Sequence, residues 1–317
     1  MRAVTYARFG PPEVLQVGQA PKPAPKAKEV LIRVHATTVC KEDPDMRAAP
    51  GFNGLLKPRH PILGQEFAGE VEAVGPGASR FRPGDRVFGL DAFGAYAEYK
   101  CLSEAATLAR MPAGLSYAEA ASVPNGALTA LPFLRDHGHV RRAHTVLVHG
   151  ASGSVGTAAV QLARVYEAEV TGVCSTPNLE LVRSLGASHV VDYTREDFTR
   201  QGHTYDLIFD AVGKLSLAQC WERLAEEGVY LTVIPGPGVL LRGLWASLVG
   251  GRQARFAATG LRPARQKADD LCFVRGLMEA GQFRPVIDRH YPLEQVAAAH
   301  RYVQGGHKKG NVVITLD

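Results

Sequence analysis

A glycine-rich turn near the middle of the chain, Val148 to Gly156, constrains the fold more than any other feature. Its sequence is VHGASGSVG. The turn follows the apolar run Thr145 to His149, and apolar residues recur at helical spacing from Ser154 to about Glu167. A strand, a tight turn and an amphipathic helix in this order predict a β-α unit of the kind that carries phosphate-binding loops.

The small residues of this turn allow its backbone amides to approach a pyrophosphate. The start of the following helix adds the positive end of its dipole. A tight turn that merely packs the helix on the strand is the alternative. Because further β-α units follow along the chain, the phosphate-binding interpretation is favoured. The predicted loop consists of Gly150, Ala151, Ser152, Gly153, Ser154, Val155 and Gly156.

Strand and helix patterns alternate through the middle of the chain. Apolar strands are predicted at 169–174, 189–192, 206–210 and 229–234, with helices at 179–185 and over Leu217, Trp221 and Leu224. Continuous apolar strands between helices are typical of a parallel sheet covered on both faces. Residues 121–262 are therefore predicted to form a doubly wound α/β domain.

The first part of the chain has a different pattern, with strands predicted at 30–36, 70–74 and 86–88. Glu70 and Glu72 alternate with apolar residues, as in a half-buried antiparallel strand. After Pro263 two helices and the strand 312–316 complete the chain. We expect this tail to return to the first unit, so that residues 1–120 and 263–317 form one discontinuous β-rich domain.

Composition excludes several classes of protein. With 46% hydrophobic and 21% charged residues, the 317-residue chain is expected to be soluble and to hold two domains. The net charge of +5 is scattered, which argues against nucleic acid as a partner. The most apolar stretch, Val239 to Val249, contains Arg242 and is shorter than the roughly 20 residues of a membrane span.

The chain begins without a secretory signal, so a cytoplasmic location is expected. Its five cysteines include no C-x-x-C pair. This distribution fits reduced thiols better than a disulfide framework or a structural zinc site.

Ser175 indicates which nicotinamide nucleotide the loop would bind. Folds that prefer NAD place an acid about 20 residues beyond the loop, where it binds the ribose hydroxyls. Ser175 occupies that position here, beside Thr176, and leaves room for a 2′-phosphate. The sequence therefore favours NADPH over NADH. Alternatively or in addition, the two hydroxyls cap the next helix.

Four stretches resemble the medium-chain dehydrogenase/reductase superfamily: Gly64 to Val71, Arg82 to Val87, Gly94 to Tyr99 and His149 to Gly156. They are most similar to its zinc-free quinone reductase branch, near the reticulon-4-interacting-protein-like members. The resemblance runs the whole length of the chain. It implies a GroES-like substrate domain, a Rossmann domain, a cofactor in the cleft between them, and a homodimer.

The resemblance also implies roles for residues around the nucleotide. Ser175, Thr176 and Tyr193 would surround the 2′-phosphate, whereas the ribose and nicotinamide would contact Thr129, Val155, Val212, Val233 and Ile234. One departure concerns the cation that this branch often places just after the serine. Pro177 and Asn178 follow here, so discrimination between the nucleotides is expected to be modest.

Zinc-dependent relatives bind their catalytic metal through a cysteine, a histidine and a third ligand. Cys40 is present, but Gln65 replaces the histidine, and Ser122 to Gly126 supplies no thiolate. Neutral amide oxygens are poor ligands for zinc, so no catalytic zinc is expected. Cys40 is then a small core or pocket residue. A zinc-dependent alcohol dehydrogenase remains the alternative reading.

Without a Lewis acid, reduction of a conjugated carbonyl is easier than oxidation of an alcohol. We therefore expect hydride transfer from NADPH to a quinone or an α,β-unsaturated carbonyl. The alternative is a nucleotide-binding protein with negligible turnover. The loops Phe52 to Pro61 and Pro235 to Thr259 would shape the acceptor pocket. The resemblance places four polar candidates near the nicotinamide: Asp43, Arg47, Tyr96 and Asn125.

Each of these four candidates also has a structural alternative. Asp43 would orient backbone or Arg47, Tyr96 would belong to an amphipathic strand, and Asn125 would form a turn. The histidines His35, His60, His149 and His300 are isolated in the sequence and are expected to be structural.

Overall fold

The computed structural model describes residues 1–234 and 251–316. The chain divides into two units, one formed by Met1–Asn125 with Pro263–Asp317 and the other by Gly126–Arg262. Each unit has its own sheet and its own apolar core.

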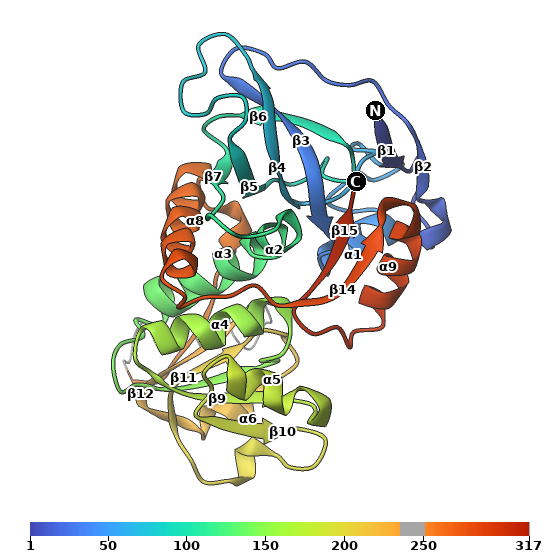
Figure 1. Ribbon diagram of the computed structural model, residues 1–317. Helices are drawn as coiled ribbons and strands as arrows, with labels where there is room; N and C mark the ends of the chain where they lie inside the picture. The colour runs from blue at the N-terminus through green and yellow to red at the C-terminus, as the bar shows by residue number, and fades with distance from the viewer. Residues whose placement is uncertain (235–250, 317) are drawn as a thin grey trace. The chain divides into compact units, whose positions relative to one another are not determined.

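The sheet of the first unit is built around β3 (Glu29–Thr38), which pairs antiparallel with β4 (Glu66–Val74) and β15 (Asn311–Thr315). Figure 1 shows the C-terminal strand β15, in red, beside the N-terminal β3, in blue. The remaining strands of this sheet are β5 (Arg86–Leu90), β6 (Tyr99–Ser103), β7 (Thr107–Arg110) and β14 (Ile287–Pro292). A separate pair is formed by β1 (Arg2–Thr5) and β2 (Gln16–Gln19). As the alternation predicts, Glu70 and Glu72 of β4 are exposed while Val71 is buried.

Helices cover this sheet and enclose its core. Ser116 caps α2 (Tyr117–Ala121) with a capping box, and α2 packs against β3 and β4. The longest helix, α8 (Ala264–Glu279), packs against β7. The others are α1 (Glu42–Ala48), α9 (Val296–Gln304), and the short turns η1 (Pro12–Val14) and η6 (Leu293–Gln295). Phe67 and Ile32 of the sheet are completely buried in this core.

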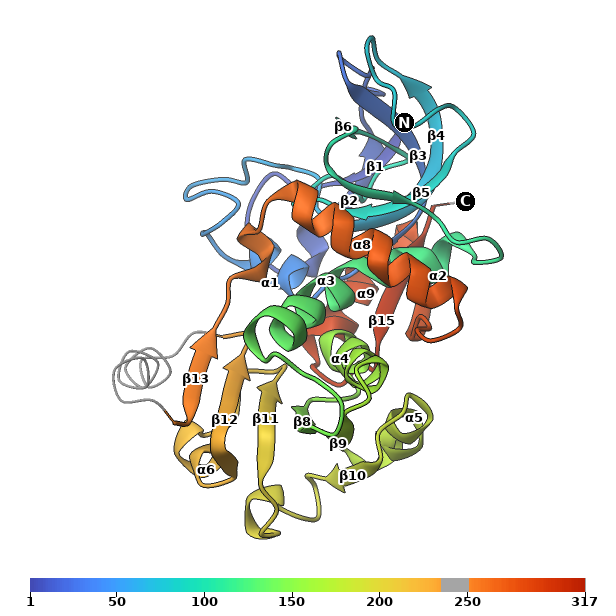
Figure 2. The ribbon, with the colours of Figure 1, turned by 90° about the vertical axis from the view of Figure 1, so that its left-hand side faces the viewer.

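The second unit has a parallel sheet of six strands among the described residues, in the order β10-β9-β8-β11-β12-β13. Figure 2 shows these strands side by side, from β13 on the left to β10 on the right. The strands are β8 (Thr145–His149), β9 (Glu169–Cys174), β10 (His189–Asp192), β11 (Tyr205–Asp210), β12 (Leu224–Thr232) and β13 (Gln253–Phe256). This order confirms the predicted doubly wound fold.

The helices of the second unit follow its strands. They are α4 (Ser154–Val165), α5 (Leu179–Ser184) and α6 (Leu217–Trp221), with a π-turn η2 (Phe133–His137) and the 3₁₀ turns η3 (Thr176–Asn178), η4 (Phe198–Arg200) and η5 (Thr259–Leu261). The helix α3 (Pro124–Pro132) spans the boundary between the ranges of the two units. The spacing of Leu217, Trp221 and Leu224 predicts one helix, but Leu224 belongs to β12, where it pairs with Tyr205 of β11. The apolar stretch 239–249 lies outside the described residues.

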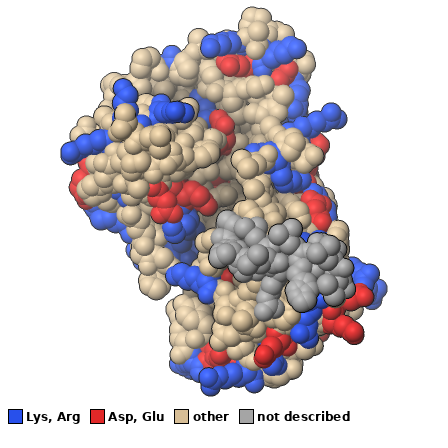
Figure 3. All heavy atoms as spheres, turned by 180° about the vertical axis from the view of Figure 1, so that it is seen from behind, with Lys and Arg blue, Asp and Glu red and all other residues tan. Residues whose placement is uncertain are grey.

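Basic and acidic side chains are mixed over the surface seen in Figure 3. Within the described parts of the chain, no helix is both long enough and apolar enough to cross a membrane.

Candidate functional site

Five parallel strands of the second unit end along one edge of its sheet. The last residues of β8, β9, β10, β11 and β12 are His149, Cys174, Asp192, Asp210 and Thr232. The predicted nucleotide residues that directly follow these ends are Gly150 to Gly156, Ser175, Thr176, Tyr193, Val212, Val233 and Ile234. Since parallel strands present their carboxyl ends at the same edge, the fold brings this set together. The order of the strands reverses at β8, which is where open α/β sheets bind ligands.

The loop after β8 has the geometry of a phosphate cradle. Gly150 has φ +76°, and a Cβ on Gly156 would stand 2.0 Å from the carbonyl oxygen of Gly150. A side chain at position 156 would therefore displace backbone, and one at position 150 would be strained by the positive φ and would collide with the Val212 side chain. The loop leads into α4 at Ser154, where the first amides of a helix have no intrahelical acceptor. Among the described residues, the buried Oγ of Ser154 also has no hydrogen-bond partner.

Asp210, which the sequence analysis did not single out, hydrogen-bonds both to the strand before this loop and to the loop after β11. Asp210, fully buried at the end of β11, accepts a hydrogen bond of 2.9 Å from Nδ1 of His149. Its carboxylate also accepts from the amides of Val212, Gly213 and Leu215 at 2.8–3.1 Å. Burial alone would raise the pKa of Asp210, but these hydrogen bonds outweigh burial and hold its pKa below the usual range. His149 is thus a partner of a buried carboxylate, a pairing that spacing along the chain could not reveal.

At the end of β9, the side chains of Ser175 and Thr176 do not cap the next helix, which was one of the roles expected for them. Ser175 accepts a hydrogen bond of 3.1 Å from Asn178 Nδ2, and its side chain makes no helix-capping bond. The Thr176 hydroxyl donates to Asp192 of the adjacent strand. An acid therefore does lie beside the candidate 2′-phosphate position, supplied by β10 and not by β9. Hydrogen bonds from Thr176 and Thr194 keep the pKa of Asp192 below its usual range.

The other predicted nucleotide residues lie as follows. Tyr193 is 54% exposed and Ile234 is 52% exposed, at the ends of β10 and β12. Val212 approaches Gly150 so closely that a Cβ on that glycine would stand 2.3 Å from it. Thr129 belongs to α3, not to the strand edge; α3 nevertheless approaches the loop, since Gly126 packs against Ser154.

Three of the four polar candidates are buried together in the first unit. Asp43 and Arg47 of α1 and Tyr96 are each fully buried. The Tyr96 hydroxyl donates to Asp43 at 3.1 Å and lies 3.2 Å from Nε2 of His300 in α9. Burial raises the pKa of Asp43 to about 7, and burial together with Arg47 lowers the pKa of His300 to about 3. Arg47 donates to the carbonyl of Gly10, while its Nε and Nη2 have no partner among the described residues.

Asn125 and Cys40 meet at a buried carboxylate. The backbone amide of Asn125 donates to Glu66 at 2.7 Å, and the Cys40 thiol donates to the same carboxylate at 3.2 Å. Burial, reinforced by Glu66, raises the pKa of the Cys40 thiol well above its usual range. Gln65 is half-buried beside this group. In residues 1–234 and 251–316, no group of three or more His, Cys, Asp or Glu side chains could hold a metal ion.

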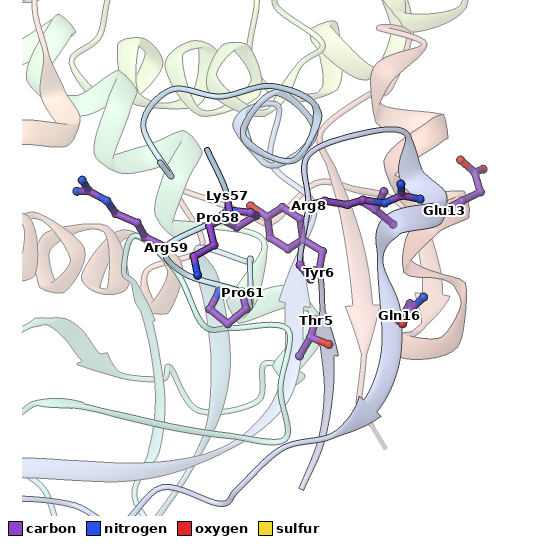
Figure 4. Close-up of a pocket in the computed structure, with 11 residues that line it drawn as sticks. Thr5, Tyr6, Arg8, Glu13, Gln16, Lys57, Pro58, Arg59 and Pro61 are labelled. Atoms are coloured by element: carbon purple, nitrogen blue, oxygen red, sulfur yellow. The ribbon is translucent and has the colours of Figure 1, made fainter. Parts of the chain in front are cut away.

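Part of the expected acceptor loop carries exposed apolar side chains. Phe52 is 77% exposed and stacks on Phe93 with ring centroids 5.9 Å apart. Phe93 stacks in turn on His60 at 4.3 Å. The end of the same loop, at Lys57 to Arg59 and Pro61, lines a hollow of about 650 Å³ whose wall also includes Tyr6, drawn in Figure 4. Of the second predicted loop, residues 235–250 lie outside the described residues.

Two family models match the chain: the alcohol dehydrogenase GroES-like domain over residues 26–133, and a zinc-binding dehydrogenase domain over residues 185–314. Human quinone oxidoreductase is 32% identical over 100% of this chain and 98% of its own. The human mitochondrial NAD(P)H oxidoreductase RTN4IP1 is 30% identical over 91% of this chain and 82% of its own. The chain therefore belongs to the medium-chain dehydrogenase/reductase superfamily, in its quinone oxidoreductase branch.

Solved structures share the fold. The quinone oxidoreductase of Coxiella burnetii has a TM-score of 0.87 at 30% identity and covers 100% of this chain and 99% of its own. The Escherichia coli quinone oxidoreductase complexed with NADPH has a TM-score of 0.86 at 22% identity, with complete coverage of both chains. The chain is a quinone-oxidoreductase-like enzyme with a GroES-like and a Rossmann-type domain.

Proposed function

We propose that the protein is a zinc-independent, NADPH-dependent reductase of quinones or other α,β-unsaturated carbonyls. The observation that carries this proposal is the glycine cradle between β8 and α4, set at the switch point of a doubly wound sheet in a quinone oxidoreductase relative. In this proposal the unit Gly126–Arg262 binds the nucleotide and the other unit binds the acceptor. The homodimer and the cytoplasmic location stay predictions.

The residues present fit a dinucleotide. Amides of Ser154 to Gly156 and the unpartnered Ser154 hydroxyl would hold the pyrophosphate. The Asp210 carboxylate would keep Val212 against Gly150, next to the nicotinamide ribose. When bound, the reduced nicotinamide supplies the hydride. NADPH is the nucleotide named for the E. coli relative of the same fold.

The residues present do not fit a catalytic zinc. Cys40 is a protonated thiol that donates to Glu66, and Gln65 offers only an amide where a ligand would be needed. Such a site would need three protein ligands and one open position. Although one matching family model is described as a zinc-binding dehydrogenase, we derive no step through a metal.

The acceptor class is inferred from the relatives and from the stacked rings. Flat conjugated molecules bind well to exposed aromatic faces, and Phe52 offers such a face on top of Phe93. Hydride addition to a conjugated carbonyl leaves negative charge on oxygen, which polar groups or water then protonate. No described side chain is singled out as the proton donor.

A panel of acceptors separates this function from its two alternatives. Purified protein is mixed with NADPH or NADH and with quinones, enones, aldehydes or simple alcohols, and nucleotide oxidation is followed at 340 nm. Enzyme-dependent NADPH oxidation with quinones or enones is expected. Alcohol oxidation that requires zinc would support the dehydrogenase instead, and tight NADPH binding without turnover would support a binding protein.

A further inference from the structure

Two loops, residues 175–180 after β9 and 193–197 after β10, face each other at the proposed adenosine end of the nucleotide. Thr176 of the first loop donates to Asp192 at the base of the second, and the amide of Tyr193 donates to the carbonyl of Cys174 at 3.1 Å. These bonds tie the loops together. Any group that reaches the Ser175 hydroxyl therefore also lies near the side chains that follow Asp192.

Acidic groups dominate this pair of loops. Asp192 remains ionised, and the Oε1 of Glu196 accepts a hydrogen bond of 3.4 Å from the amide of Asp192. Glu180 is paired with Arg183 in α5, whereas Asp197 lies 3.7 Å from Arg200, the same separation that Asp192 has from Arg195. The acids Glu180, Asp192, Glu196 and Asp197 outnumber the arginines Arg183, Arg195 and Arg200 by one, which leaves a local excess of negative charge. By itself, this charge would repel a phosphate.

Arg195 is the single cation within these two loops. Its Nε lies 3.7 Å from Asp192 Oδ2, too far for a normal hydrogen bond, and its side chain is 74% exposed. Among the described residues the guanidinium therefore has no partner at hydrogen-bonding distance, and it lies near the Asp192 oxygen that accepts from Thr176. An arginine in this state can turn to bind a phosphate through two parallel N–H groups.

We propose that Arg195 is the cation that binds the 2′-phosphate of NADPH, replacing the basic residue that the Ser175 loop lacks. This inference rests on the proposed function, because it assumes that the strand edge binds a nicotinamide dinucleotide. Since Asp192 and Glu196 repel phosphate, the preference for NADPH over NADH depends on the positive charge of Arg195, while the neutral Ser175 leaves room for the phosphate. Without Arg195, the remaining charge favours the uncharged ribose hydroxyl of NADH.

The test measures the dissociation constants of NADPH and NADH by fluorescence titration for the wild type and for Arg195→Ala, Arg195→Lys and Arg200→Ala. Arg200→Ala is a matched control, because Arg200 has the same 3.7 Å contact with an acid three residues earlier. Arg195→Ala is expected to weaken NADPH about tenfold or more while NADH binding stays constant. Arg195→Lys should retain most of the NADPH affinity, and Arg200→Ala should change neither constant.

A ratio of the two constants that is unchanged in Arg195→Ala, or changed equally in Arg200→Ala, overturns the assignment of Arg195. If NADPH oxidation by a quinone persists in that case, the proposed function stands without it. If the wild type binds neither nucleotide, both proposals fail together. Raising the salt concentration should weaken NADPH binding to the wild type more than to Arg195→Ala, because screening acts on the charge that the variant has lost.

Discussion

At the residue scale, Asp210 shows how one buried carboxylate organises a site. It accepts hydrogen bonds from His149 on one strand and from three amides of the following loop. Asparagine at this position would replace one of the two acceptor oxygens with an NH₂ group, which would then point at N–H donors. We expect Asp210→Asn to lower the free energy of unfolding by about 1–3 kcal/mol. Urea denaturation followed by circular dichroism measures this loss.

Asp206 provides the control for this prediction. It lies at the other end of β11 and is half-buried, and among the described residues its side chain accepts bonds only from the Thr145 amide and hydroxyl. Asp206→Asn should lower the free energy of unfolding by less than Asp210→Asn does. Equal losses for the two variants would contradict the special role of the Asp210 carboxylate.

Ser175 carries a second prediction at this scale. A carboxylate in its place would add a further negative charge beside Asp192, where the 2′-phosphate is proposed to bind. Ser175→Asp should therefore weaken NADPH far more than NADH, by at least about tenfold in the ratio of dissociation constants. An unchanged ratio would mean that the phosphate binds elsewhere.

At the element scale, α1 and α9 are joined through buried polar groups whose ionisation opposes folding. The raised pKa of Asp43, about 7 in the folded chain, means that the folded state binds the proton more tightly than the unfolded state. The stability from this proton is fully present below the ordinary aspartate pKa of about 3.9. It is lost as the pH rises from there through about 7.

Asp43→Asn removes this pH dependence, because the amide has no proton to lose. Between pH 5 and pH 7 the variant should gain on the order of 2 kcal/mol in unfolding free energy relative to the wild type. Urea unfolding at a series of pH values measures the difference. A difference that does not vary with pH would show that Asp43 titrates normally.

The elements also show how far sequence reasoning reaches. The strands β8, β9 and β10 have the predicted bounds, because each is a short run rich in valine beside a turn signal. The prediction of a helix at Leu224 is wrong. The helical spacing there extends over only three residues, and pairing with Tyr205 in the sheet decides the structure instead. Contacts between distant segments, such as Asp192 with Thr176 and Tyr96 with His300, have no signal in the spacing of the chain.

At the scale of the whole molecule, the fold was predictable because two patterns, alternating strands and strand-helix repeats, occupy separate ranges of the chain. The nucleotide edge followed from the fold, since residues after parallel strands meet at one edge. The binding site of the acceptor could not be predicted in the same way. Its proposed loops depend on irregular backbone, which propensity and periodicity do not describe.

The central claim is that this chain reduces a conjugated carbonyl with NADPH and without a metal ion. It is tested most directly by the rate of NADPH oxidation by a quinone after exhaustive dialysis against a chelator, with zinc measured in the same sample. The account predicts enzyme-dependent turnover in zinc-free protein and no increase when zinc is added. Activity that disappears with the metal and returns with stoichiometric zinc would contradict it.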